Sequence, residues 1–287
     1  MTIAIGLKIG DGIILGADSA VTVGDPYNGR ANYYYNAEKV INLVKGLPLG
    51  AVAYGNFGFA GRSTTRVAKD LRRRLSDPRH VDWVNPDNFT VEEVATKVFS
   101  FFMDLHKQDH PTGGPSTGFG LIVAGYAPNA GHGEIWAIDV DDATACAGPI
   151  KHFDSTTVGI LWRGQGEALN RLIRGWSSDN LTRLGDPSLP REEVRAAFDS
   201  VAPLWNSAMP IQDGIDLVRY LAEVVAGFVR FIDTPTTVAP PIDVAAITLH
   251  EGFKWVQRKH YYGSELNREP WVHDRPHTPA APEDSDG

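Results

Sequence analysis

The sequence predicts an α+β fold in which strands and helices follow one another in blocks. Two hairpin-like runs of β-branched residues come first, two helical segments follow, and strands, helices and strands complete the order. Because strict β-α-β alternation is absent, this order favours a layered sandwich over a parallel doubly wound sheet. With 43% hydrophobic residues in 287, the chain can bury a sizeable core.

The predicted strands are short apolar runs bounded by turn residues. The first hairpin joins residues 2–9 to 13–17 through a Gly-Asp-Gly turn, and the second joins 39–44 to 49–53. The polar, aromatic stretch 24–35 between them is predicted as a loop. Later strands are expected at residues 118–125, 133–138, 157–159, 242–249 and 253–256.

The predicted helices carry apolar residues at helical spacing and recognisable start signals. One begins near Ser63, and a second follows Thr90, where Glu93 completes a capping box. The longest periodic segment covers residues 211–231, and shorter helices are expected at 167–176 and from 190. Residues 264–287 are rich in Pro, Asp and Glu and are predicted to be a disordered tail, which leaves one domain at 2–263.

Composition excludes several classes of protein. Lys and Arg number 27 against 35 Asp and Glu, a net charge of −8, which argues against nucleic acid as the main partner. No apolar stretch reaches the roughly 18–20 residues of a membrane span. The single cysteine, Cys146, and the lack of a signal peptide favour the cytoplasm. Scattered histidines and a lone Gly-x-Gly at 164–166 predict neither a metal nor a cofactor.

The sharpest chemical signal is Thr2. Met followed by a small residue is normally trimmed, which would expose Thr2 with a free α-amine. Such a residue carries a nucleophile and a base together, because its hydroxyl can attack a carbonyl while its amine, with a pKa of about 7.7–8.0, accepts the proton. The Met-Thr pair is common and does not by itself indicate a catalytic threonine, so the prediction depends on the surrounding sequence.

Several separated blocks resemble the β-type subunits of the proteasome family, which are N-terminal-nucleophile hydrolases, and are most similar to bacterial proteasome-like peptidases. The blocks are Thr2 to Lys8, Asp11 to Ser19, Glu38 to Leu43, Ala53 to Asn56, Leu121 to Tyr126 and Thr157 to Ala168. Asp18 lies 16 positions after Thr2, which is the family spacing. The resemblance implies a four-layer αββα sandwich of the N-terminal-nucleophile hydrolase type.

The resemblance also implies a role for each matching residue. Thr2 would be the nucleophile, Lys39 would favour the developing negative charge, Asp18 would hold Lys39, and the Gly55 amide would stabilise the oxyanion. Taken singly, Asp18 could be a strand-end turn residue, Lys39 an exposed edge lysine and Gly55 a tight-turn glycine.

Three further positions complete the implied site, with departures from the family pattern. Gln165 stands where the family has a serine that supports the amine. Asp233 and Thr236 are the candidates for a second supporting pair, where the family has Asp and Ser.

The predicted function is therefore that of a threonine endopeptidase, acting on peptide or unfolded-protein substrates in a ring-like homo-oligomer, with a separate ATPase as a possible partner. Two alternatives stay open. One is an amidase or acylase that acts on a small molecule with the same fold, because fold does not fix substrate. The other is an inactive scaffold subunit, which the Gln165 substitution favours most.

Overall fold

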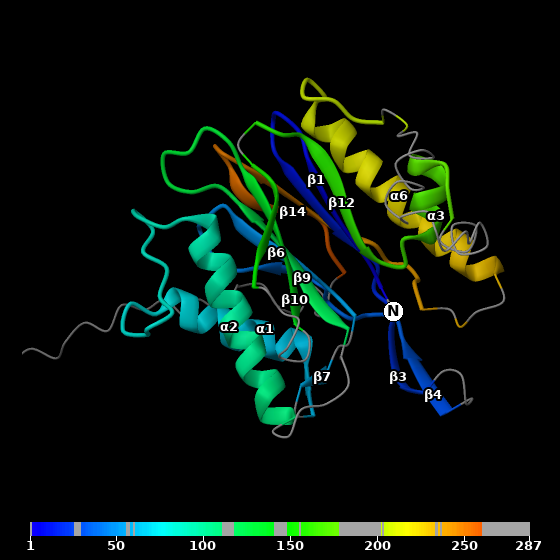
Figure 1. Cartoon of the computed structure of the whole chain (residues 1–287), viewed down its shortest axis with the longest axis horizontal. Coiled ribbons are helices and arrows are strands. Elements are labelled where there is room, and N and C mark those ends of the chain that lie inside the picture. Colours follow the sequence, from blue (N-terminus) through cyan, green and yellow to red (C-terminus); the bar gives the residue numbers. More distant parts are fainter. Residues whose placement is uncertain are drawn as a thin grey trace, which may run out of the picture.

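The computed structural model describes residues 2–25, 30–55, 58–59, 61–110, 118–140, 148–154, 156–177, 202, 204–232, 235 and 237–259. Two five-stranded antiparallel sheets dominate it (Figure 1). The strand order of the first sheet is β12 (Gly159–Gly164), β1 (Ile3–Lys8), β2 (Ile13–Ala17), β13 (Asp243–Thr248) and β14 (Gly252–Gln257). The second sheet runs β11 (Ile150–Phe153), β10 (Glu134–Val140), β9 (Phe119–Gly125), β6 (Leu49–Tyr54) and β5 (Val40–Asn42).

The two sheets face each other across a shared apolar core. Side chains such as Leu15 of β2, Val52 of β6 and Ile122 of β9 lie there with no exposed surface. Every residue of β1, β2 and β6 is buried, which explains why these strands are nearly continuous apolar runs rather than alternating ones.

Helices cover parts of the outer faces (Figure 1). Helices α1 (Thr64–Ser76) and α2 (Val91–Asp109) pack on the second sheet. Helix α6 (Ile211–Phe231) packs on the first sheet beside the short α3 (Glu167–Leu169), which continues into a π-helical turn, η1 (Asn170–Arg174). The hydroxyls of Ser63 and Thr90 cap α1 and α2, so both predicted helix starts are confirmed.

Two predictions made from the sequence are wrong. A complete four-layer αββα sandwich is not what the structure has: antiparallel strands dominate, and the described residues contain only four α-helices, α1, α2, α3 and α6. The stretch 24–35 is not simply a loop, because β3 (Val21–Asp25) and β4 (Arg30–Tyr34) form a hairpin of their own. The sequence did not predict these strands because one side of the two-stranded ribbon faces solvent, and the polar and aromatic residues there give no apolar strand pattern. A second small ribbon pairs β7 (Gly58–Phe59) with β8 (Arg62–Ser63).

This architecture places the start of the chain at a central position. Because β1 lies between β12 and β2, Thr2 continues a fully buried strand and is fully buried itself. The helix predicted from residue 190, Cys146 and the predicted tail lie outside the described residues. Within the described part, no helix has both the length and the apolar character needed to span a membrane.

Candidate active site

Asp18 follows β2 and is held by backbone amides on both of its carboxylate oxygens. Oδ1 accepts from the amide of Ile3 at 3.1 Å, and Oδ2 accepts from those of Ala20 at 2.9 Å and Ala239 at 3.2 Å. The residue has no exposed surface. These three donors come from different segments, so they fix the carboxylate in one orientation and offset part of the cost of burying it.

Lys39 precedes β5, and its ammonium joins Asp18 to Thr2. Its Nζ donates to Asp18 Oδ1 at 2.7 Å and to Thr2 Oγ1 at 2.7 Å. Both side chains of the ion pair are 0% exposed. Burial lowers the pKa of Lys39 below its ordinary value, and the neighbouring Asp18 carboxylate opposes that shift. The structure thus brings three of the predicted residues together, although they lie 16 and 21 positions apart.

Thr2 is fixed through its backbone as well as its hydroxyl. Its carbonyl accepts a hydrogen bond of 2.7 Å from the amide of Gln165, just after β12. Gly164, which precedes it, adopts a φ of +89°, and a Cβ added there would lie 1.8 Å from the Thr2 carbonyl oxygen. A glycine is therefore required where β12 passes the start of the chain.

Replacing Gly164 with alanine is expected to displace Thr2. A methyl group at 1.8 Å from an oxygen forces the backbone apart, and the positive φ adds strain for any residue with a side chain. We expect a loss of stability of about 2 kcal/mol or more. A urea unfolding curve measures this loss. The matched control is Gly227→Ala on α6, where an added Cβ meets nothing within 4 Å, and an equal loss in both variants would contradict the expectation.

Gly55 ends β6 in a left-handed turn. Its φ is +85°, and an added Cβ would lie 1.6 Å from the Gly118 carbonyl oxygen, so only glycine fits this turn. The turn is anchored near Lys39, because the amide of Ala53 donates to the Lys39 carbonyl at 2.9 Å. Its neighbour Tyr54 points elsewhere, with its hydroxyl bonded to Asp139. The oxyanion role of Gly55 stays a prediction.

Of the remaining predicted positions, only Gln165 lies within the described residues. Gln165 contacts Thr2 through its backbone amide. Asp233 and Thr236 lie outside the described residues. Close to them, Thr237 is 2% exposed, and its Oγ1 has no hydrogen-bond partner in the described part of the chain.

A second buried ion pair, which was not predicted from the sequence, lies beside the first. Asp243 opens β13 opposite Ala17, and its carboxylate binds the ammonium of Lys259, which also donates to Ser19 Oγ at 2.6 Å. Burial raises the pKa of Asp243, and Lys259 counteracts that rise. Lys259 also lowers the pKa of Lys39, whereas Asp243 raises it. The sequence feature that could have predicted this pair is Asp243 within the apolar run 242–249, because a buried carboxylate needs a partner.

The arrangement offers acid–base and nucleophilic chemistry. In the described ranges, no group of three or more His, Cys, Asp and Glu side chains is placed to hold a metal ion. The chemical groups at hand are a hydroxyl, an ammonium and a carboxylate, linked in series by two hydrogen bonds. Such a series can orient a hydroxyl and favour negative charge developing on its oxygen.

Comparison with known proteins shows which solved structures have a similar fold. No protein-family model and no curated protein matches the chain. Among solved structures, Anbu (ancestral beta-subunit) from Yersinia bercovieri matches at a TM-score of 0.55 and 13% identity, covering 93% of this chain and 91% of that one. The chain shares the Anbu fold. An Anbu (Gly-1) mutant from Hyphomicrobium sp. strain MC1 matches at a TM-score of 0.54 and 13% identity, with 93% and 92% covered.

These neighbours correct the predicted family. The expected membership of the proteasome β-type subunit family is wrong, because the matching structures are Anbu proteins, a proteasome-like but distinct family. At 13% identity the likeness to Anbu shows a common fold and no more. The sequence blocks that carried the β-type resemblance contribute strands to both sheets: β1, β2 and β12 to the first, and β5, β6 and β9 to the second. Activity has to be argued from the site itself.

Proposed function

We propose that this chain is a proteasome-related threonine peptidase whose nucleophile is Thr2, exposed by removal of Met1. The observation that carries the proposal is the Lys39 ammonium, which lies 2.7 Å from both Thr2 Oγ1 and Asp18 Oδ1 in a fully buried setting. A buried lysine held by a carboxylate and pointed at a hydroxyl is costly to maintain. Its position beside the second residue of the chain suits an N-terminal nucleophile.

In the proposed reaction, Thr2 Oγ1 attacks the carbonyl carbon of a peptide bond while the Thr2 α-amine takes the hydroxyl proton. The amine then passes that proton to the departing amine of the substrate, which leaves an ester on Thr2. A water molecule cleaves the ester, which releases the acid product and restores the hydroxyl. Lys39 stabilises negative charge on Oγ1, Asp18 holds Lys39, and the Gly55 amide is the proposed oxyanion donor.

The proposed substrate cleft is the cavity of about 610 Å³ between the β3–β4 hairpin and the start of α1. Its lining combines apolar and aromatic side chains with polar ones, and Val23 and Tyr34 are both 55% exposed. The backbone connects it to the site, because the Ala37 amide donates to the Ser19 carbonyl at 3.0 Å, next to Asp18. The lining residues are Val21, Val23, Tyr34, Tyr35, Asn36, Ala37, Ser63, Thr64, Thr65 and Lys69.

We further propose that the chain works as a homo-oligomer and receives unfolded protein from a separate ATPase. The description of its structural neighbours as ancestral β-subunits supports assembly. Sedimentation or light scattering of the purified chain measures the assembly directly, and a monomer at micromolar concentration would contradict it.

The decisive test of the proposed nucleophile is intact mass spectrometry. The Thr2 nitrogen is a peptide amide until Met1 is removed, so the proposal requires that removal to free the amine that acts as base. We expect a mass that lacks Met1, and an added mass on Thr2 after treatment with a peptide β-lactone. Retained Met1, or labelling confined to other residues, would favour the inactive scaffold.

A further inference from the structure

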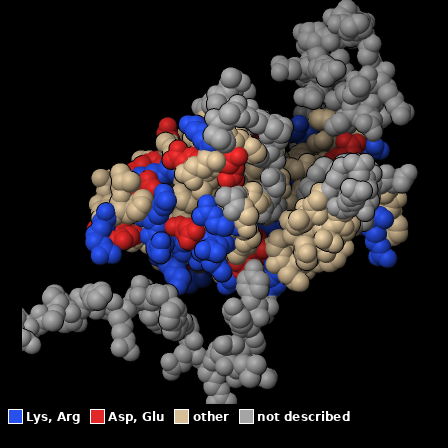
Figure 2. Space-filling model, turned by 90° about the horizontal axis from the view of Figure 1, so that it is seen from below, with Lys and Arg blue, Asp and Glu red and all other residues tan. Residues whose placement is uncertain are grey.

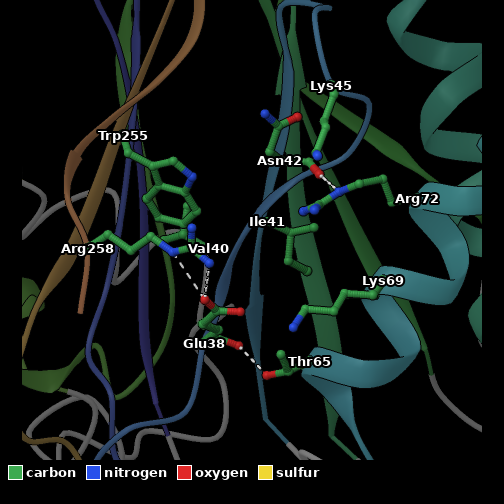
Figure 3. A pocket seen from close by; sticks show the side chains of 11 residues that line it. Glu38, Val40, Ile41, Asn42, Lys45, Thr65, Lys69, Arg72, Trp255 and Arg258 are labelled. Atoms are coloured by element: carbon green, nitrogen blue, oxygen red, sulfur yellow. Dashed lines mark hydrogen bonds and ion pairs between the residues drawn. The ribbon is translucent and has the colours of Figure 1, made fainter. Parts of the chain in front are cut away.

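A second cavity, of about 260 Å³, lies along β5, the edge strand of the second sheet, between helix α1 and the end of β14 (Figure 3). Three segments that are distant in sequence line it: β5 with Glu38 before it and Lys45 after it, helix α1, and the end of β14 with Arg258 just after it. The lining side chains that carry the argument are Glu38, Asn42, Lys45, Lys69, Arg72 and Arg258.

The charge of this cavity is opposite to that of the protein. Its lining holds four cationic side chains and one carboxylate, a formal balance of +3, whereas the whole chain carries −8. Figure 2 shows Lys and Arg gathered on one half of the face seen from below, the side of the molecule that carries α1 and α2. Cations concentrated in a hollow of limited solvent access create a positive potential that attracts anions.

Arg72 is held in position before any ligand arrives. Its side chain is half-buried, and its Nε donates to the Asn42 carbonyl at 2.6 Å, which aims the guanidinium across the cavity (Figure 3). Burial and the nearby Arg258 lower the pKa of Arg72, whereas Glu38 raises it. A guanidinium fixed through Nε leaves its terminal N–H groups as a planar fork, the geometry that matches two oxygens of a phosphoryl or carboxylate group.

Arg258 lies at the edge of the cavity and is paired with its one carboxylate. The Arg258 guanidinium lies 4.9 Å from the centre of the Trp255 ring and donates to one oxygen of Glu38. Because this ion pair offsets the charge of Glu38, the lining keeps an excess of positive charge.

We propose that this cavity binds a small polyanion, a compact molecule bearing a phosphoryl group or several carboxylates. Arg72 grips the anion, while Lys45, Lys69 and Arg258 supply the balancing charge. A volume of about 260 Å³ suits a ligand of about the size of pyrophosphate or citrate and is too small for a nucleic-acid segment.

An anion bound in this cavity can affect the candidate active site through Glu38 and Arg258, each of which is next in sequence to a lysine of a buried ion pair. Glu38 immediately precedes Lys39, and Arg258 immediately precedes Lys259. A bound anion competes with Glu38 for Arg258, whose Nη2 lies 2.6 Å from Glu38 Oε1. Loss of that ion pair would change the rate of peptide hydrolysis, and this effect rests on the proposed function. Binding of the anion does not depend on the proposed function.

Titration with inorganic pyrophosphate tests the site, with calorimetry and Trp255 fluorescence as readouts. We expect saturable binding that weakens at least tenfold in Arg72→Gln and in Lys45→Gln, whose exposed side chain has no structural role. Arg73→Gln, one position along the same helix and exposed, is the matched control and should bind as the wild type does. Trp255→Phe should lose the fluorescence change and keep the calorimetric signal.

Two outcomes would overturn the proposal: absence of saturable binding in the wild-type chain, or equal weakening in Arg72→Gln and Arg73→Gln. Citrate in the same titration separates the two sources of negative charge. Equal affinity supports a site for polyanions of either kind, and weaker citrate binding supports a phosphoryl ligand. Binding without any change in peptide turnover would keep the site and remove only its coupling to Lys39.

Discussion

Replacing Thr2 with alanine should lower peptide hydrolysis by about 10³-fold or more while leaving the fold intact. The substitution removes Oγ1, the atom that Lys39 contacts at 2.7 Å, and with it the proposed nucleophile. The backbone anchor survives, because the Thr2 carbonyl still accepts from the Gln165 amide. Alanine is also small enough for Met1 to be removed, so the processing of the two chains stays comparable. Initial rates on a fluorogenic peptide measure the loss.

Two controls separate the nucleophile from its surroundings. Thr2→Ser keeps a hydroxyl beside Lys39 and should retain measurable activity. Insertion of a lysine between Met1 and Thr2 keeps the threonine side chain and prevents trimming, so it should be inactive if the free amine is the base. Hydrolysis by Thr2→Ala at the wild-type rate would show that another residue carries the reaction.

The parts of this molecule that local sequence determines were predicted from the sequence. The β1–β2 hairpin depends on its Gly-Asp-Gly turn, and α1 and α2 begin where Ser63 and Thr90 cap them. The convergence of Thr2, Asp18 and Lys39 came from a family resemblance rather than from periodicity. That resemblance named the wrong family, but the three residues that it indicated lie together in the structure.

The parts that long-range packing determines were not predicted. Asp243 and Lys259 pair only because β13 lies beside β2 and the chain then turns back after β14. The β3–β4 ribbon has too little buried surface to produce an apolar alternation. Nothing in the local sequence of 167–176 marks the change from α-helix to π-helix, since i→i+5 bonding is decided by how that turn packs on α6. The four-layer prediction failed because it was transferred whole from the resemblance.

Replacing Lys39 with methionine should have the second large effect, on both stability and activity. Methionine fills a similar volume but leaves the Asp18 carboxylate buried with backbone donors alone. Removing one partner of a buried ion pair costs about 3–5 kcal/mol, so the urea midpoint should fall accordingly. Hydrolysis should fall by about 10³-fold or more, because the charge that stabilises Oγ1 is gone.

Lys259→Met is the matched control for this prediction. It removes a buried ammonium from the neighbouring pair and leaves Asp243 uncompensated, so a comparable loss of stability is expected. Lys259 does not contact Thr2, however, so hydrolysis by the folded fraction should fall much less than in Lys39→Met. Equal loss of activity in the two variants, measured at a temperature where circular dichroism shows both to be folded, would mean that Lys39 acts only as a structural ion-pair partner.

The double variant Asp18→Asn with Lys39→Met separates chemistry from stability. Neutralising both partners removes the unpaired charge, so part of the lost stability should return. The introduced asparagine can still accept from the amides of Ala20 and Ala239 through its one oxygen, whereas the amide of Ile3 loses its acceptor, so the recovery should be partial. Activity should stay as low as in Lys39→Met alone, because neither substitution restores a cation beside Oγ1. Recovery of hydrolysis together with stability would contradict the role proposed for Lys39, since a site that works without its ammonium cannot depend on that ammonium for charge stabilisation.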